Sequence, residues 1–130
     1  MEFSIDTASR QPIYRQLSQQ IREAVARGRL KPGERIPSVR ELSRRMVVNP
    51  NTIARVYTEL EREGLLVTRP GLGVFVAPRG SELSLKVRRE RISLLLEECL
   101  TEAVLLGFTA AEIRKLFEER LSRFEWSTKG

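Results

Sequence analysis

The sequence predicts a mostly α-helical fold with one small β-hairpin, built as an N-terminal domain of residues 1–78 and a two-helix segment of residues 79–130. Three observations carry this prediction. Apolar residues recur at helical spacing in five segments of the chain. Two short apolar runs flank the tip Pro70-Gly71-Leu72-Gly73, which is typical of a hairpin. The tripeptide Pro78-Arg79-Gly80 marks the linker between the two parts.

The first helix is expected to begin with Pro12, because proline is favoured at the first helical position. Gly28 is expected to end it, since glycine commonly follows the last helical turn. Residues 1–11 are expected to be irregular. The apolar positions of this helix are Ile13, Leu17, Ile21, Ala24 and Val25.

Two further helices are predicted from their N-terminal caps. Ser38 and Glu41 have the spacing of a capping box, which starts the second helix, and Val47-Val48 then forms a tight apolar bend. Asn49 caps the third helix, with Pro50 at its first position. The core is expected to include Val39, Leu42, Ile53, Val56, Leu60 and Phe75.

The rest of the chain is predicted as two strands and two helices. The runs 65–69 and 74–77 are the strands of the hairpin. A long helix covers 83–106 and ends at Gly107, and a second capping box at Thr109-Ala-Ala-Glu112 starts the last helix.

The positive charge of the chain is concentrated in one window. The 23 Lys and Arg exceed the 17 Asp and Glu, for a net charge of +6. Residues 1–78 hold 13 basic and 8 acidic side chains, and the window Arg35–Val56 holds five arginines against one glutamate. This concentration favours a polyanion-binding face, although a charge that serves only solubility stays open.

Several classes of function are excluded by composition. The chain has no His, which removes the Ser-His-Asp and Cys-His arrangements, and we expect it not to be an enzyme. The lone Cys99 allows no intrachain disulfide and no cysteine-based zinc site, and no metal or other cofactor is expected. Neither a membrane-spanning apolar run nor a signal peptide is evident, so the protein is expected in the cytoplasm without a membrane partner.

The order helix, helix, tight turn, helix, hairpin is that of a winged helix-turn-helix domain, whose third helix enters the major groove of double-stranded DNA. The residues that carry a family resemblance are Pro12–Leu17, Leu30–Ser43, Asn49–Tyr57, Leu60–Leu65 and Gly71–Val76. Over about residues 10–78 the chain resembles the GntR family of bacterial transcription regulators. The 52 residues after Pro78 fit the YtrA-like subfamily, whose short tail serves mainly for dimerisation.

The resemblance implies a set of DNA-binding residues. Arg40 matches the family's Ser-x-Arg-Glu-Leu arginine, which reads a guanine or grips a phosphate, and the arginine fork suits both. The sequence departs from the family where Ala54 replaces a common arginine, and the neighbouring Arg55 points about 100° away around the helix. The candidate DNA-binding residues are Tyr14, Ser38, Arg40, Arg44, Arg45, Asn49, Asn51, Thr52, Arg55, Arg69 and Gly71.

The apolar stripes of the last two helices exceed what two helices bury against each other, so we expect a homodimer. Cys99 lies on this stripe, where packing is favoured over redox sensing. The candidate dimerisation residues are Leu85, Ile92, Leu95, Leu96, Cys99, Leu100, Ala103, Leu106, Ile113, Leu116, Phe117, Leu121 and Phe124.

The sequence is therefore interpreted as a repressor that binds an inverted-repeat operator as a homodimer. The resemblance implies transporter genes as targets and, in some members, a small-molecule effector. The competing hypothesis is a winged-helix module that binds DNA or a protein without sequence preference.

Overall fold

The computed structural model describes residues 2–78 and 85–127. The chain divides into two compact units, Met1–Arg79 with Glu125–Gly130, and Gly80–Phe124. Each unit is described by itself. Among the described residues, no helix combines the length and the apolar character needed to cross a membrane.

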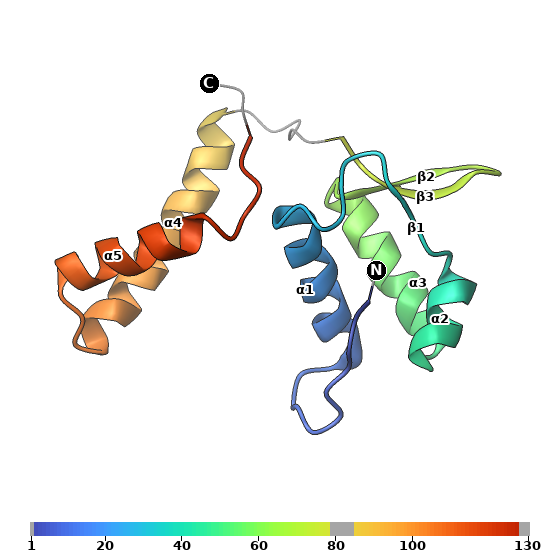
Figure 1. The fold of residues 1–130 in the computed structure, drawn as a ribbon, viewed down its shortest axis with the longest axis horizontal. Coiled ribbons are helices and arrows are strands. Elements are labelled where there is room, and N and C mark those ends of the chain that lie inside the picture. Colours follow the sequence, from blue (N-terminus) through green and yellow to red (C-terminus); the bar gives the residue numbers. More distant parts are fainter. Residues whose placement is uncertain (1, 79–84, 128–130) are drawn as a thin grey trace. The chain divides into compact units, whose positions relative to one another are not determined.

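The first unit contains three helices and a three-stranded antiparallel sheet (Figure 1). The helices are α1 (Ile13–Ala26), α2 (Val39–Met46) and α3 (Pro50–Arg62). The strands are β1 (Arg35–Ile36), β2 (Leu66–Arg69) and β3 (Gly73–Val76), in the order β1-β3-β2. Helices and hairpin thus form the predicted winged helix-turn-helix.

The prediction of two strands was incomplete, because β1 adds a third to the edge of the hairpin. In β1, Arg35 pairs with Phe75 and Ile36 pairs with Val74 of β3. A strand of two residues is too short to show an alternating apolar pattern. Strand β1 forms because the segment before α2 lies alongside β3. This pairing joins residues far apart in the sequence, so no local pattern reveals it.

The core of this unit lies between the three helices and the inner face of the sheet. Of the six expected core residues, Leu42, Ile53, Val56 and Leu60 are fully buried and Val39 packs against them. Phe75 is a correction: it is only half-buried and lies outside the core cluster. Its register partner Val67 occupies the same outer face, while Leu66, Val74 and Val76 face inward.

The start of α1 also differs in detail from the prediction. Pro12 is the N-cap of α1, one position before the first helical residue, and Ile13 is exposed. The buried Gln16 side chain binds the backbone of Asp6 and Gln11, at 2.9–3.1 Å. The irregular N-terminal residues are therefore held against α1.

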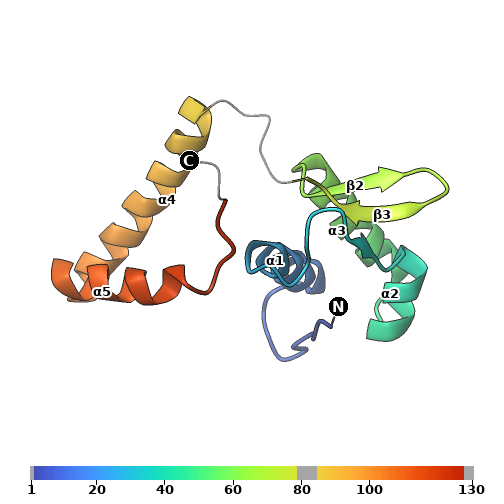
Figure 2. The same ribbon diagram turned by 45° about the horizontal axis from the view of Figure 1, so that its top comes forward.

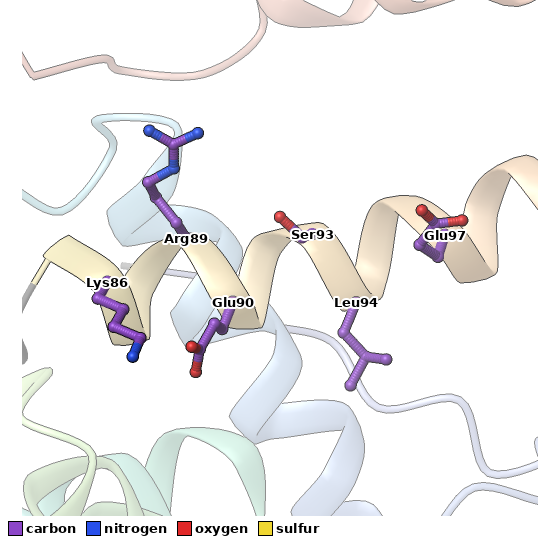
Figure 3. Close-up of a pocket in the computed structure, with 6 residues that line it drawn as sticks. All are labelled: Lys86, Arg89, Glu90, Ser93, Leu94 and Glu97. Atoms are coloured by element: carbon purple, nitrogen blue, oxygen red, sulfur yellow. The ribbon is translucent and has the colours of Figure 1, made fainter.

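The second unit consists of α4 (Leu85–Leu105) and α5 (Ala110–Leu121), joined through Gly107. The expected capping box starts α5, since Thr109 and Glu112 bond each other's backbone N–H at 3.1 and 2.9 Å. Figure 3 shows the first half of α4, where Lys86, Glu90 and Leu94 extend along one side of the helix.

The candidate dimerisation residues are mostly exposed within one chain. Ala103 is buried, and Ile113, Leu121 and Phe124 are half-buried. Exposed are Leu85, Ile92, Leu95, Leu96, Cys99, Leu100, Leu106, Leu116 and Phe117. Further apolar side chains that the predicted stripe omitted are also exposed, namely Leu94, Val104, Leu105 and Phe108.

Candidate nucleic-acid interface

The N-terminus of α2 is built by the predicted capping box. The Ser38 hydroxyl accepts from the Glu41 N–H at 3.1 Å, and the Glu41 carboxylate accepts from the Ser38 N–H at 3.3 Å. The hydrogen bond from the Ser38 backbone holds the pKa of Glu41 below its ordinary value, with smaller contributions from the Ser38 side chain and from Arg35 and Arg45. Arg40 follows in the first turn with its side chain exposed.

Tyr57 of α3 positions this start of α2, a role that sequence reasoning missed. Its hydroxyl donates to the Pro37 carbonyl at 2.7 Å, just before the cap. Burial raises the pKa of the Tyr57 hydroxyl above its ordinary value, so the hydroxyl remains a donor. Tyr57 is buried in the core although it is absent from the expected core residues, and its helical spacing says nothing about the polar end of the ring.

The turn between α2 and α3 contains an unusual backbone conformation. Val47 has φ 54° and ψ 51°, in the left-handed region, and its side chain is 90% exposed. This conformation is unfavourable for a β-branched residue. Val48 next to it packs against the core, and the Ser43 hydroxyl donates to the Val48 carbonyl at 2.6 Å. The predicted bend is therefore confirmed.

The N-terminus of α3 presents short polar side chains. Asn49 is the predicted N-cap, with its Oδ1 accepting from the Asn51 N–H at 2.8 Å, and Pro50 is the first helical residue. Asn49 and Asn51 are exposed and Thr52 is half-buried. A helix N-terminus with unpaired N–H groups favours a negatively charged ligand such as phosphate.

Positive charge lies along α2, with Arg40 in its first turn and Arg44 and Arg45 in its last turn. Arg40, Arg44 and Arg45 are all exposed on α2. Arg22–Glu63 and Arg55–Glu59 are ion pairs within the described part of the chain, and neither uses an arginine of α2. The three α2 arginines are thus available to an external anion.

Arg55 and Tyr14 form one cluster across α1 and α3. The Arg55 guanidinium carbon lies 3.8 Å from the centroid of the Tyr14 ring, and its Nε lies 3.4 Å from the Glu59 carboxylate. A cation over an aromatic ring is stabilised by the ring's electron-rich face. The two residues, proposed separately from the sequence, lie together, and Arg55 already has partners within the chain.

The hairpin forms the wing. Figures 1 and 2 both place its tip on the same side of the unit as α2, away from α1. Gly71 at the tip and Arg69 before it are exposed, as is Leu72. Arg35 of β1 is also exposed beside this hairpin, and it is absent from the residues proposed from the sequence. The position of Arg35 in the basic window Arg35–Val56 was the signal that could have identified it as a DNA-binding candidate.

Within the described part of the chain, no group of three or more His, Cys, Asp or Glu side chains is placed to hold a metal ion.

Comparisons with known proteins agree with this geometry. The model of the family described as bacterial regulatory proteins, gntR family, matches residues 13–76. The transcriptional repressor YtrA of Bacillus subtilis is 37% identical over 114 residues, which cover 88% of this chain and 85% of YtrA. A crystal structure of a transcriptional antiterminator from Listeria monocytogenes EGD-e is 37% identical, with a TM-score of 0.79 over 100% of this chain and 98% of that one.

The DNA-binding domain of AraR, solved in complex with the operator ORX1, is also similar. It is 29% identical with a TM-score of 0.53, and the match covers 59% of this chain and 96% of that one. Relatives of this chain are transcription regulators, and the fold, the basic helix starts and the wing are those of a DNA-binding domain. The chain therefore belongs to the gntR family of bacterial regulatory proteins and is a transcriptional regulator that binds DNA.

Proposed function

We propose that the protein is a repressor that binds an inverted-repeat operator as a homodimer, with residues 1–78 as the DNA-binding domain and 79–130 as the dimerisation segment. The single observation that carries the dimer is the exposed apolar surface of α4 and α5. Exposed contiguous apolar surface marks an interaction site. A two-fold dimer presents two recognition helices to the two halves of an inverted repeat.

The apolar surface of the second unit is too large for a solitary helical hairpin. In α4, large apolar side chains from Leu96 to Leu105 are between 40% and 76% exposed. Leu94, which is 63% exposed, and Leu105 lie outside the predicted stripe, so the helix is apolar on more than one side. A helix of this kind is normally buried in a larger core. The same helices of a second chain supply that core.

On DNA, we assign base contacts to Arg40 and to the exposed polar residues at the start of α3. Arg40 has no ion-pair partner among the described residues, and its fork matches guanine O6 and N7. Asn49, Asn51 and Thr52 lie at the N-terminus of α3, and we assign them contacts to bases or phosphates. We assign Ser38, Arg44, Arg45, Arg55 and Tyr14 to the phosphate backbone, and Arg69 and Gly71 to wing contacts.

Repression follows if the dimer occupies a promoter, and YtrA of Bacillus subtilis is named a repressor. Such a regulator acts in the cytoplasm. By resemblance to YtrA-like proteins we extend the proposal to transporter genes as targets and to a small-molecule effector.

The proposal is tested by selecting duplexes from a random-sequence pool with the full-length protein. An enriched inverted repeat supports it, and sedimentation of the same sample must show a dimer. Enrichment of single half-sites by a monomer contradicts the dimer. No enrichment over the starting pool contradicts sequence-specific regulation and favours a module without sequence preference.

A further inference from the structure

The outer face of the wing sheet brings together two arginines and an aromatic ring. Antiparallel pairing places Arg35 opposite Phe75, and Phe75 opposite Val67, so these side chains share one face. Arg69 lies two residues beyond Val67 and therefore on the same face, opposite Gly73. The face is distinct from the inner one, where Leu66, Val74 and Val76 pack on the core.

Arg35 lies across the backbone of Gly73. A Cβ atom at position 73 would stand 2.8 Å from the Arg35 Nε and 3.6 Å from its Cδ and Cζ. Gly73 also has φ 124°, a conformation that side-chain-bearing residues rarely adopt. The glycine therefore provides the space in which the Arg35 side chain rests.

Arg69 leans over β3 from the opposite strand. Its guanidinium carbon lies 5.2 Å from the centroid of the Phe75 ring. Arg35 starts opposite Phe75 and reaches Gly73, while Arg69 starts opposite Gly73 and reaches Phe75. The two side chains thus cross the same short stretch of β3 and converge on it from both sides.

Neither arginine has a carboxylate partner among the ion pairs of the described residues. The charge of Arg35 contributes to the lowered pKa of Glu41, but the Glu41 carboxylate accepts a hydrogen bond from the Ser38 N–H in the capping box. Two arginine side chains that reach the same two residues of β3, Gly73 and Phe75, without a carboxylate partner form a site for an anion. Their planar donor forks match the oxygens of a phosphate.

The occupant that fits this place is the phosphate backbone of the bound DNA. The hairpin tip lies on the same side of the unit as α2 (Figure 2). Helix α2 directly precedes α3, the helix that is expected to enter the major groove. We propose that Arg35 and Arg69 together hold one phosphate of the DNA backbone, and that Gly73 is the residue that positions Arg35 for this contact. The proposal rests on the DNA binding described above.

The test measures the affinity of the full-length protein for a scrambled duplex at several salt concentrations. One lost phosphate contact lowers the slope of log K against log [salt] by about 0.9 and weakens binding roughly tenfold at 0.1 M salt. The single variants are Arg35→Ala, Arg35→Lys, Arg69→Ala and Gly73→Ala. The double variants combine Arg35→Ala with Arg69→Ala or with Gly73→Ala. Arg62→Ala is the matched control, because it removes an exposed arginine from the C-terminal end of α3.

For the variant that combines Arg35→Ala with Arg69→Ala, we expect the slope of log K against log [salt] to fall by about 0.9 per protomer, since only one phosphate contact is lost. Loss of about 1.8 would show two independent contacts and overturn the shared site. Gly73→Ala should resemble Arg35→Ala although it keeps every charge, and should add little to the Arg35→Ala variant. Arg35→Lys, which keeps the charge, should restore part of the slope, and Arg62→Ala should leave it unchanged.

An unchanged slope and affinity for Arg35→Ala would overturn the proposal. So would weaker binding to the selected operator with unchanged binding to the scrambled duplex, because Arg35 would then read bases. Thermal unfolding of each variant separates a folding defect from a lost contact. If the wild-type protein does not distinguish operator from scrambled duplex, sequence-specific regulation fails, while the slopes on scrambled DNA still decide the role of the two arginines.

Discussion

Replacing Val47 by glycine should stabilise the protein, although it removes a large side chain from the turn between α2 and α3. Val47 has φ 54° and is 90% exposed, so almost no buried contact is lost. The left-handed conformation costs a side-chain-bearing residue about 1–2 kcal/mol. Glycine brings back roughly 0.5–1 kcal/mol of extra chain entropy in the unfolded state. The expected net gain is about 0.5–1 kcal/mol.

Urea denaturation of Val47→Gly and wild type, at equal protein concentration, measures this difference. The midpoint should rise without a change in the dependence on urea, and Tm should rise by roughly 3–6 °C. Val47→Ala is the matched control, because alanine removes the branched side chain but keeps the Cβ that makes φ 54° unfavourable. A Val47→Gly protein no more stable than wild type, or an alanine variant that gains as much, would refute the reasoning.

Three other predictions test the cap, the buried hydroxyl and the dimer. Because the pKa of Glu41 is lowered on folding from 4.5, its contribution to stability is present above about pH 4.5 and lost as pH falls below that value. Glu41→Gln should flatten this part of a profile of Tm against pH; an unchanged profile contradicts the assignment. Tyr57→Phe should cost about 1–2 kcal/mol of unfolding free energy, because the Pro37 carbonyl loses its 2.7 Å donor, and calorimetry that shows no loss rejects this role. Leu95→Glu should convert the dimer to monomer in sedimentation, whereas Leu72→Glu on the wing tip should not; a Leu95→Glu dimer argues against the α4 interface.

The sequence was a good guide wherever the determining interaction is local. Both capping boxes formed as predicted, because Ser38 with Glu41 and Thr109 with Glu112 need only a spacing of three residues. The N-cap Asn49 and the first helical residue Pro50 start α3 for the same reason. Helical periodicity likewise placed the buried side of α3.

Prediction failed where distant segments meet. The pairing of β1 with β3 is long-range, so the third strand and the outward position of Phe75 had no local signal. The same pairing places Arg35 over Gly73, which is why Arg35 was missed as a candidate. Arg55 was considered for its position on α3 alone, and its contact with Tyr14 depends on how α1 and α3 pack.

The apolar residues of α4 show the limit for assembly. Their spacing predicted a buried stripe, and within one chain they are exposed apart from Ala103 and the half-buried Val87. The periodic spacing of apolar residues predicts that this helix surface is buried, but it does not identify the chain that buries it.

The central claim is that the two helix starts and the wing form a sequence-specific DNA-binding face, with Arg40 as a base-reading residue. Competition between the selected operator and a scrambled duplex, at one fixed salt concentration, tests it most directly. The wild-type protein should prefer the operator by about 10³-fold or more. Arg40→Ala should lose about 1–3 kcal/mol on the operator and tolerate substitution at one base pair of each half-site. A wild-type ratio near one, or an Arg40→Ala variant with unchanged operator affinity, would contradict the account.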